Sequence, residues 1–225
     1  MPDSAFAKAA VAAVSLLGSN MASLDASTAR TKSQPVSIVA FGDSLTAGYG
    51  LRSSEAFPAR LQAALRSKGY DVTVTNAGIS GDTSSGGLAR VGRSIPAGTD
   101  LVIVELGAND ILRGVPPSVT ERNLDGILRQ VRAGGSDVIL AGMIAPFGFG
   151  NEFSRSFDPI YQRLAARHSA TLYPFFLKGV AARKSLNLPD GLHPNAAGVD
   201  TIVENVLPTV MRKLMTMKET RSVLD

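Results

Sequence analysis

The sequence contains no cysteine. This absence excludes disulfides, thiolate nucleophiles and thiolate metal sites, but it leaves the compartment open, because reducing and oxidising environments both tolerate such a chain. Histidine is scarce too, with two residues in the chain. Any reaction that needs an imidazole as its base must therefore use His168 or His193.

A basic stripe interleaved with aromatic residues is also missing, although the formal net charge is +4. Lysines and arginines occur singly along the expected helices, which is typical of a solvated surface of mixed sign rather than of a nucleic-acid interface. The 225 residues, 44% of them hydrophobic, are enough to bury one core of good size. We therefore expect one soluble domain that binds no nucleic acid.

The apolar run near the N-terminus is too short to cross a bilayer. This run, Ala9–Gly18, follows Lys8, has the length of a signal-peptide core and precedes the small residues Ser27-Thr28-Ala29. We expect residues 1–35 to be a signal peptide and linker, and the mature protein to be periplasmic or secreted without stable membrane insertion. The start of the chain is poorly basic, so a disordered or loosely helical leader on a cytoplasmic protein is the competing interpretation.

From residue 36 onward, short apolar segments alternate with segments of helical periodicity. We expect strands at 36–41, 71–76, 100–106, 137–143 and 171–173, and helices with apolar faces that include Phe57, Leu124, Phe157 and Val199, with a further helix after Thr83. Pro208 is expected to kink the last helix. This alternation predicts a three-layer α/β/α sandwich around a mainly parallel five-stranded sheet, with the turn after each strand at one edge. We assign residues 36–217 to this domain and 218–225 to a C-terminal tail.

The first of these strands ends in Gly42-Asp43-Ser44-Leu45, which places Ser44 on a sharp turn that exposes its side chain. Alone, such a turn is more often a plain connection or a phosphate cradle. The next two strand ends bring Gly81 and Asn109 to the same edge of the sheet. A hydroxyl, a backbone N–H and a carboxamide there are the groups needed to attack a carbonyl and hold its oxyanion.

His193 is the stronger candidate for a base, because it lies in a loop tightened by Gly191 and Pro194 just before the last helix. Asp190, three residues earlier, can fold its carboxylate onto one imidazole nitrogen while the other nitrogen faces the site. On its own, an Asp-x-x-His segment is more often a helix cap. His168, near the end of its own helix, is expected to be structural.

Four short blocks follow one another along the chain: Gly42–Leu45, Gly78–Thr83, Gly107–Asp110 and Asp190–Pro194. In this order and at about this spacing they resemble the conserved blocks of the SGNH hydrolase (GDSL esterase/lipase) superfamily, whose fold is flavodoxin-like. The resemblance runs from about residue 36 to residue 210. Further segments at 48–50, 86–90 and 173–176 resemble the branch of bacterial arylesterases and multifunctional acyl thioesterase/lysophospholipase enzymes.

The resemblance implies that Ser44 is the nucleophile, His193 the base and Asp190 the residue that orients the base. It also implies an oxyanion hole formed by the backbone N–H groups of Ser44 and Gly81 and by the side-chain amide of Asn109. It brings no cofactor.

Two further acidic residues, Asp43 and Asp110, stand beside residues that already have a role. We expect them to hold their turns by accepting backbone N–H bonds rather than to bind a metal, so we expect no metal site. Asp82 and Thr83 are expected to form the N-terminal cap of the following helix.

The function indicated by these features is hydrolysis of aryl or alkyl esters with short to medium acyl chains, and the resemblance extends this to acyl thioesters and lysophospholipids. The segment after the fourth strand supplies the candidate substrate contacts Ile144, Phe147, Phe149 and Phe153. An ordinary surface loop that packs its phenylalanines onto the core fits that segment equally well.

Two alternative functions stay open. One is a carbohydrate O-acetylesterase of the same superfamily. The other is a non-catalytic α/β protein that uses the glycine turns to bind an anion or a sugar, in which case the complete set of nucleophile, base, orienting acid and oxyanion donors would be a coincidence.

Overall fold

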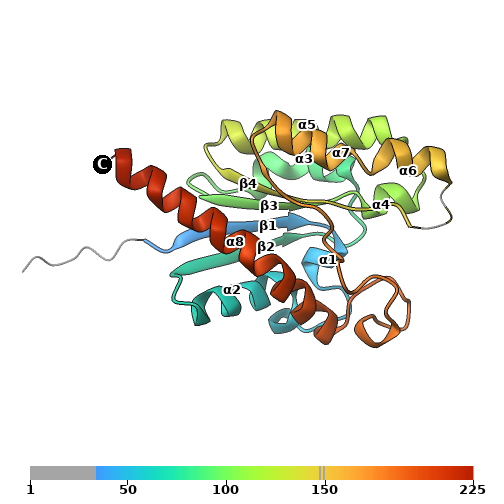
Figure 1. Ribbon diagram of the computed structural model, residues 1–225, viewed down its shortest axis with the longest axis horizontal. Coiled ribbons are helices and arrows are strands. Elements are labelled where there is room, and N and C mark those ends of the chain that lie inside the picture. The colour runs from blue at the N-terminus through green and yellow to red at the C-terminus, as the bar shows by residue number, and fades with distance from the viewer. Residues whose placement is uncertain (1–33, 147, 149, 225) are drawn as a thin grey trace, which may run out of the picture. The chain divides into compact units, whose positions relative to one another are not determined.

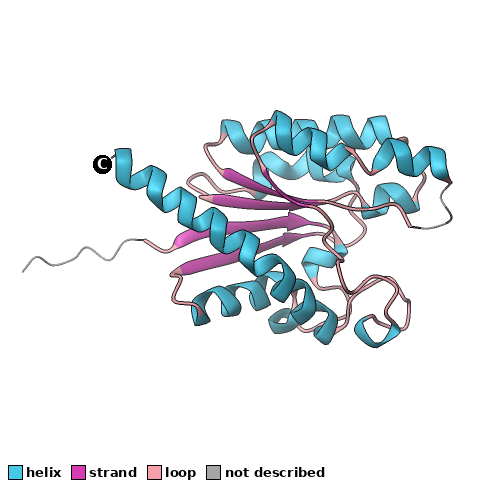
Figure 2. Cartoon of the chain, in the orientation of Figure 1, coloured by secondary structure: helices cyan, strands magenta, loops and turns pink. Residues whose placement is uncertain are grey.

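A five-stranded sheet is the centre of this computed structural model, which describes residues 34–146, 148 and 150–224. The strands are β1 (Val36–Gly42), β2 (Val72–Gly78), β3 (Leu101–Glu105), β4 (Asp137–Ala141) and β5 (Thr171–Tyr173), in the spatial order β2-β1-β3-β4-β5 (Figure 1, Figure 2). Every neighbouring pair is parallel. The expected parallel five-stranded sheet is therefore confirmed, and its strand order is that of flavodoxin-like folds.

Helices cover both faces of the sheet, which confirms the three layers (Figure 1). One face carries α2 (Phe57–Ser67) and α8 (Ala196–Leu224), and the other carries α3 (Ser84–Ser94), α5 (Pro117–Ala133), α6 (Asn151–Phe157) and α7 (Ile160–Arg167). The short helices α1 (Ser44–Ala47) and α4 (Ala108–Leu112) and the 3₁₀ turns Ser53–Glu55 and Lys184–Leu186 lie in the connections.

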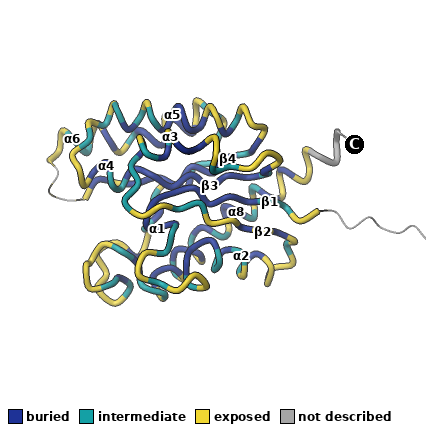
Figure 3. Tube along the Cα trace, turned by 180° about the vertical axis from the view of Figure 1, so that it is seen from behind, coloured by how far each residue is buried: buried dark blue, intermediate teal, exposed yellow. Residues whose placement is uncertain are grey.

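Burial is greatest in the central strands, which Figure 3 draws in dark blue. Every residue of β3 is buried, because a parallel strand in the middle of the sheet is covered by helices on both faces. At the edge of the sheet, β2 alternates instead: Val72 and Val74 are buried, whereas Thr73 and Thr75 are exposed. The continuous apolar run and the alternating run in the sequence thus correspond to a central strand and an edge strand.

The first three strands end level with one another. Gly42, the last residue of β1, pairs with Gly78 at the end of β2 and with Glu105 at the end of β3. The turns that follow these strands therefore begin side by side at one edge of the sheet. They carry Ser44 and Asn109, together with the loop that contains Gly81, so the common edge expected for these residues is confirmed.

One helix expected around Phe157 is two helices in the structure. α6 ends at Phe157 and α7 begins at Ile160, with Asp158 and Pro159 between them. Pro159 has no N–H to donate and its ring interferes with the preceding turn, which favours a break in the helix at this position. The Asp158 carboxylate instead accepts the backbone N–H of Ala145 at 2.9 Å, which ties this break to the loop after β4.

The last helix runs further than expected. α8 continues through Pro208 to Leu224, so residues 218–224, expected as a tail, prolong the helix. The kink at Pro208 stays a prediction.

The expected signal peptide and linker, residues 1–35, lie outside the described residues except for Gln34 and Pro35. Within the described part of the chain, no helix has both the length and the apolar content needed to span a bilayer.

Candidate active site

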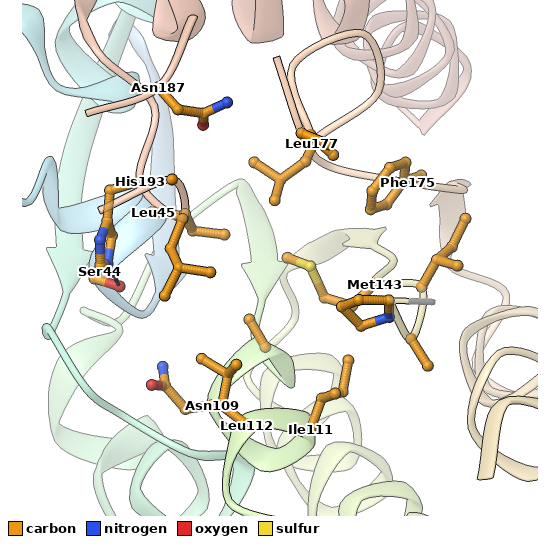
Figure 4. A pocket seen from close by; sticks show the side chains of 18 residues that line it. Ser44, Leu45, Asn109, Ile111, Leu112, Met143, Phe175, Leu177, Asn187 and His193 are labelled. Carbon is orange, nitrogen blue, oxygen red and sulfur yellow. Dashed lines mark hydrogen bonds between the residues drawn. The ribbon is translucent and has the colours of Figure 1, made fainter. Parts of the chain in front are cut away.

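Ser44, His193 and Asp190 are joined by two hydrogen bonds at the carboxyl edge of the sheet. Ser44 Oγ lies 2.9 Å from His193 Nε2, and His193 Nδ1 lies 2.7 Å from Asp190 Oδ2. Figure 4 shows the Ser44 and His193 side chains directed at each other. A hydroxyl, an imidazole and a carboxylate in this order form the geometry of a nucleophile, its base and the group that orients the base.

The loop that carries His193 is held by its own hydrogen bonds. Asp190 Oδ1 accepts the backbone N–H groups of Leu192 at 2.9 Å and of His193 at 3.0 Å, and Leu188 donates its N–H to the His193 carbonyl at 2.7 Å. The backbone N–H of His193, followed by its imidazole and by the N–H of Leu192, lowers the pKa of Asp190 to about 2. Asp190 is therefore a carboxylate at neutral pH.

Ser44 starts helix α1 directly after β1. Asp43 caps this helix, because its Oδ1 accepts the N–H of Leu45 at 3.0 Å. Gly42 is required by close approach, since a Cβ at this position would overlap Thr46 Oγ1 and the Glu105 carboxyl group. The turn expected from Gly42-Asp43-Ser44 therefore forms through a glycine that admits its neighbours and an aspartate that accepts a backbone N–H.

The three expected oxyanion donors come from three successive strand ends. The backbone N–H groups of Ser44 and Gly81 donate to no acceptor within the described part of the chain. The Asn109 amide links the neighbouring turns, because its Nδ2 donates to Asp43 Oδ2 at 3.1 Å and to the Asp82 carbonyl at 3.0 Å. Two free N–H groups and one fixed carboxamide thus lie around the serine turn.

The turn that presents Asn109 depends on Gly107, whose φ of 122° is disfavoured for other residues. A Cβ at Gly107 would also overlap the Tyr161 hydroxyl, which donates to the Leu106 carbonyl at 2.8 Å. Asp110 was expected to hold its own turn. It is buried and instead accepts the backbone N–H of Ser84 at 2.8 Å, which ties this turn to the start of α3.

The start of α3 is capped by one of the two residues expected there. Thr83 is the N-cap residue, and its hydroxyl accepts the N–H of Gly86 at 3.3 Å. Asp82, expected to share the cap, instead pairs its carboxylate with Arg90 at 2.7 Å. Within the described residues, no group of three or more His, Asp or Glu side chains is arranged to hold a metal ion.

A buried carboxyl group, not expected from the sequence, lies beneath the serine turn. Glu105 is 0% exposed, and its Oε2 accepts Thr46 Oγ1 at 2.7 Å and the Asp43 N–H at 3.4 Å. Burial, together with the nearby Asp43 carboxylate, raises the pKa of Glu105 well above its ordinary value. Burial also raises the pKa of Asp43 to about 6, although the Leu45 N–H and the Asn109 amide oppose the shift. The sequence could have pointed to Glu105, because it is the one charged residue within the apolar strand 101–106.

A cavity of about 430 Å³ opens beside Ser44 and His193. Its walls are mostly apolar and come from the segments that follow β1, β3, β4 and β5 and from the loop around His193 (Figure 4). The apolar residues of this wall include Leu45, Ile111, Leu112, Met143, Ile144, Phe175, Leu177 and Leu192. A small apolar group attached to a carbonyl is the kind of ligand that such a site accommodates.

The four expected substrate contacts have different outcomes. Ile144 lines the cavity. Phe147 and Phe149 lie outside the described residues. The prediction for Phe153 was wrong, because this residue does not line the cavity. Its ring stacks on Phe157 at 5.6 Å between ring centroids and packs against the core. The alternative interpretation, a phenylalanine that packs onto the core, is therefore the one that Phe153 fulfils.

Several wall residues escaped the sequence reasoning although a signal existed. Phe175 and Leu177 follow β5, and the strand-end rule that located Ser44 and Asn109 applies to that strand as well. Tyr49 does not line the cavity, but it contacts the site, because its ring lies 4.4 Å from the His193 ring between centroids. Aromatic packing of this kind restricts how far the imidazole can turn.

His168 lies apart from this constellation. It ends α7, and its Nε2 lies 2.8 Å from Asp125 Oδ1 on α5. The expectation of a structural histidine is therefore confirmed, and His193 is the only histidine that contacts Ser44.

Comparison with known proteins agrees with this geometry. A family model described as the GDSL-like Lipase/Acylhydrolase family matches residues 40–200. Esterase TesA of Pseudomonas aeruginosa is 41% identical over 177 residues, which cover 77% of this chain and 87% of that protein. Thioesterase 1/protease 1/lysophospholipase L1 of Escherichia coli K12 is 40% identical over 159 residues, 70% of this chain and 75% of that protein.

A solved structure extends the comparison to the fold. The psychrotrophic esterase EstA from Pseudoalteromonas sp., in a form inhibited by monoethylphosphonate, superposes with a TM-score of 0.75 at 30% identity, over 80% of this chain and 98% of that chain. Together with the match of the family model over most of the domain, this similarity establishes that the chain belongs to the GDSL-like lipase/acylhydrolase family.

Proposed function

We propose that this protein hydrolyses carboxylic esters with Ser44 as nucleophile, His193 as general base and Asp190 as the group that orients His193. The observation that carries the proposal is the hydrogen-bonded chain from Asp190 to Ser44 at the mouth of an apolar cavity. The bond to Asp190 favours the tautomer with the proton on Nδ1, which leaves Nε2 free to accept the hydroxyl proton.

In the acylation half, Ser44 Oγ attacks the ester carbonyl carbon while His193 Nε2 takes its proton. The carboxylate of Asp190, with its pKa near 2, stabilises the imidazolium that forms. His193 then gives the proton to the leaving-group oxygen, and the acyl group stays on Ser44. Water, activated by the same imidazole, releases the acid and restores the serine.

The tetrahedral oxyanion would lie against the N–H groups of Ser44 and Gly81 and the amide of Asn109. In the structure both Asn109 Nδ2 bonds go to protein acceptors, Asp43 and the Asp82 carbonyl. We therefore infer that the oxyanion shares or replaces one of these bonds. Because the Asn109 amide is already oriented, little reorganisation accompanies the charge that develops on the substrate.

The shape of the cavity supports short to medium acyl chains or aryl groups. Its volume of about 430 Å³ lies at the small end of the range of small-molecule sites, roughly 300–1,000 Å³. An apolar wall suits acyl and aryl groups better than a sugar, which needs many polar partners. We therefore favour simple esters over acetylated carbohydrates, and we extend the proposal to acyl thioesters and lysophospholipids because the Escherichia coli relative bears these activities in its name.

Covalent labelling tests the proposal. A fluorophosphonate probe is expected to label the wild type and not the variant Ser44→Ala, and His193→Ala is expected to slow labelling strongly. Hydrolysis of p-nitrophenyl butyrate should fall to background in both variants. Equal labelling or equal turnover in Ser44→Ala would contradict the assignment, and a preference for acetylxylan over aryl acetates would favour the carbohydrate esterase.

We also propose that residues 1–35 form a cleaved signal peptide with linker and that the catalytic domain acts in the periplasm or outside the cell. The apolar run after Lys8 and the small residues at 27–29 support this proposal. Mass analysis of the protein from a periplasmic fraction should find a chain that has lost its first residues. A chain that still begins at Met1 and stays in the cytoplasm would contradict it.

A further inference from the structure

Large apolar side chains gather around the mouth of the catalytic cavity. Six large hydrophobic residues in the described part of the chain are strongly exposed. Three of them line the cavity, a fourth packs on His193, and a fifth directly follows β2 at the same edge of the sheet. We call these five the apolar rim: Tyr49, Ile79, Leu112, Ile144 and Leu192, each between 46% and 54% exposed. The sixth, Met215, lies on α8.

The members of the apolar rim are placed by contacts of the site itself. Leu112, Ile144 and Leu192 line the cavity beside Ser44, and Tyr49 packs on the His193 ring. Ile79 follows β2 directly, and its N–H donates to the Gly42 carbonyl at 3.0 Å. The rim therefore extends beyond the cavity wall, because Tyr49 and Ile79 do not line the cavity.

Four cationic residues stand close in the sequence to residues of the rim or the cavity. Arg113 follows Leu112, Lys178 follows Leu177, and Arg183 and Lys184 follow the cavity residue Ala182; all four are exposed. None of the four forms an ion pair with a carboxylate in the described residues.

Carboxylates lie near the mouth as well. Glu55 is paired with Arg52, whereas Asp190 keeps its negative charge because its partner His193 is the neutral base of the proposed mechanism. Asp158 accepts the N–H of Ala145, and neither Asp158 nor exposed Glu152 forms an ion pair among the described residues. The four unpaired cations outnumber these three carboxylates, so the charge beside the apolar rim is weakly positive.

We propose that the apolar rim docks this protein on the surface of an anionic phospholipid bilayer. Exposed apolar side chains within a positive surround match the headgroup boundary, where apolar groups enter the acyl region and lysines and arginines pair with lipid phosphates. Docking would place the mouth of the cavity against the lipids. Docking rests on the proposed function, because it identifies the surface that the ester-hydrolysing site would face. The protein would bind at the surface of the bilayer and would not span it.

Binding to vesicles tests docking separately from catalysis. The full chain carrying Ser44→Ala, which leaves the lipid esters intact, is sedimented with vesicles of phosphatidylcholine alone or with added phosphatidylglycerol. We expect strong binding only with the anionic lipid. Arg183→Gln with Lys184→Gln should weaken it about 25-fold, at about fivefold for each cation, and Ile79→Ser should weaken it several-fold.

The controls are Met215→Ser, the exposed apolar residue away from the rim, and Lys68→Gln with Arg93→Gln, two exposed cations away from the rim; both should bind as the parent does. With Ser44 intact, the Ile79, Arg183 and Lys184 variants should hydrolyse p-nitrophenyl acetate like the wild type. Absence of vesicle binding, equal binding to both vesicle types or equal losses in the controls would overturn the docking proposal. Normal ester hydrolysis in such a case would leave the proposed function intact.

A buried arginine joins the ends of two strands at the site. Arg90 on α3 is 3% exposed, and its guanidinium donates to Asp82 Oδ2 at 2.7 Å, to the Ala77 carbonyl at 2.9 Å and to the Gly42 carbonyl at 2.9 Å. It also lies 4.1 Å from the centroid of the Phe41 ring. A single planar cation thus ties the end of β1 to the end of β2 and to the loop after it.

We infer that Arg90 is a positioning residue for the oxyanion hole. The strand ends that it joins carry two of the proposed donors, the N–H groups of Ser44 and Gly81. A lysine at this position has no planar fork and cannot hold three acceptors in the same geometry. The inference rests on the proposed function, because it concerns the spacing of these donors.

Kinetics and inhibitor binding test the role of Arg90. Arg90→Lys should lower kcat about 10²-fold with little change in KM, and it should weaken an alkylboronate, which mimics the tetrahedral state, by a similar factor. Asp82→Asn, which keeps the carbonyl that Asn109 uses, should give a smaller loss of the same kind and guards against a folding defect in Arg90→Lys. The control Arg93→Lys changes an exposed arginine of the same helix. Folded Arg90→Lys and Asp82→Asn variants with wild-type kcat and boronate affinity would overturn the inference.

Discussion

At the scale of single residues, the carboxyl group of Glu105 has the least usual surroundings. It is fully buried, its Oε1 has no hydrogen-bond partner in the described residues, and the Asp43 carboxylate lies nearby. Burial without compensating charge favours the protonated form. The native state therefore retains a proton on Glu105 at pH values where an unfolded chain has lost it.

This proton makes stability depend on pH. The pKa of Glu105 is higher in the folded than in the unfolded protein. The contribution of Glu105 to the free energy of unfolding is therefore fully present below the ordinary pKa of 4.5 and is lost as pH rises through the folded pKa. Glu105→Gln cannot titrate, so its free energy of unfolding should gain on that of the wild type as pH increases, by at most about 1.4 kcal/mol for each pH unit. Urea denaturation at pH 5 and pH 9 measures this. Exposed Glu152→Gln is the control, and curves for Glu105→Gln and wild type that stay parallel would refute the assignment.

Asn109 is the second residue with a decisive role. Removing one oxyanion donor lowers turnover by roughly 10²–10³-fold in serine hydrolases. Asn109→Ala should therefore reduce kcat by about this factor on p-nitrophenyl esters, with a smaller change in KM. Circular dichroism checks that the variant is folded, because Asn109 also bonds Asp43 and the Asp82 carbonyl. A folded variant with wild-type kcat would remove Asn109 from the oxyanion hole.

At the scale of elements, the turn between β3 and α4 is fixed from outside by α7. Tyr161 on α7 donates its hydroxyl to the Leu106 carbonyl at 2.8 Å, one residue before the Gly107 turn that leads to Asn109. Burial raises the pKa of the Tyr161 hydroxyl well above its ordinary value, so it stays a donor. A helix distant in sequence thus supports a turn of the site.

Replacing this donor should cost stability. Tyr161→Phe leaves the buried Leu106 carbonyl without its side-chain donor, which should lower the free energy of unfolding by about 1–3 kcal/mol. Tyr173→Phe is the matched control, because the Tyr173 hydroxyl is buried with no hydrogen-bond partner in the described residues and its removal should cost nothing or stabilise the fold. Thermal and urea unfolding compare the two. Equal losses would show that the hydroxyl bond to Leu106 contributes nothing of its own.

Elements were the part of the fold that the sequence predicted best. Apolar runs followed by glycine turns predicted β1 to β4 and the candidate site residues that follow them. Both the apolar run and the glycine turn are local features of the sequence. The break at Pro159 was missed since a strong apolar period on both sides concealed it. Phe153 and Glu105 were beyond local reasoning, because only the packing of distant segments decides whether a phenylalanine faces the cavity or the core, and whether a glutamate in a strand is buried.

At the scale of the whole molecule, the site exists because three strands end level and a fourth segment returns to them. Ser44 and Asn109 lie shortly after the ends of β1 and β3, and Gly81 lies in the loop after β2. His193 arrives 149 residues after Ser44, from the loop before α8. The order of the blocks in the sequence indicated these partners, whereas the bond distances, the cavity and the apolar rim required the assembled fold.

Asp190 connects the returning loop to catalysis, and its replacement is a prediction about the assembled site. Asp190→Asn should reduce kcat by about 10³-fold or more, because the amide no longer stabilises the imidazolium and can favour the wrong tautomer. Stability should change little, since Asp190 lies on an exposed loop. Hydrolysis of p-nitrophenyl butyrate with a parallel thermal melt measures both. Undiminished turnover would mean that another group orients His193.

The measurement that tests the central claim most directly is stopped-flow release of p-nitrophenol from the acetate and octanoate esters, with intact mass recorded during turnover. We predict a burst of product with one acyl adduct in the wild type, mapped to Ser44, and neither burst nor adduct in Ser44→Ala. The absence of an adduct on wild-type protein, with equal slow release by both proteins, would contradict the serine mechanism.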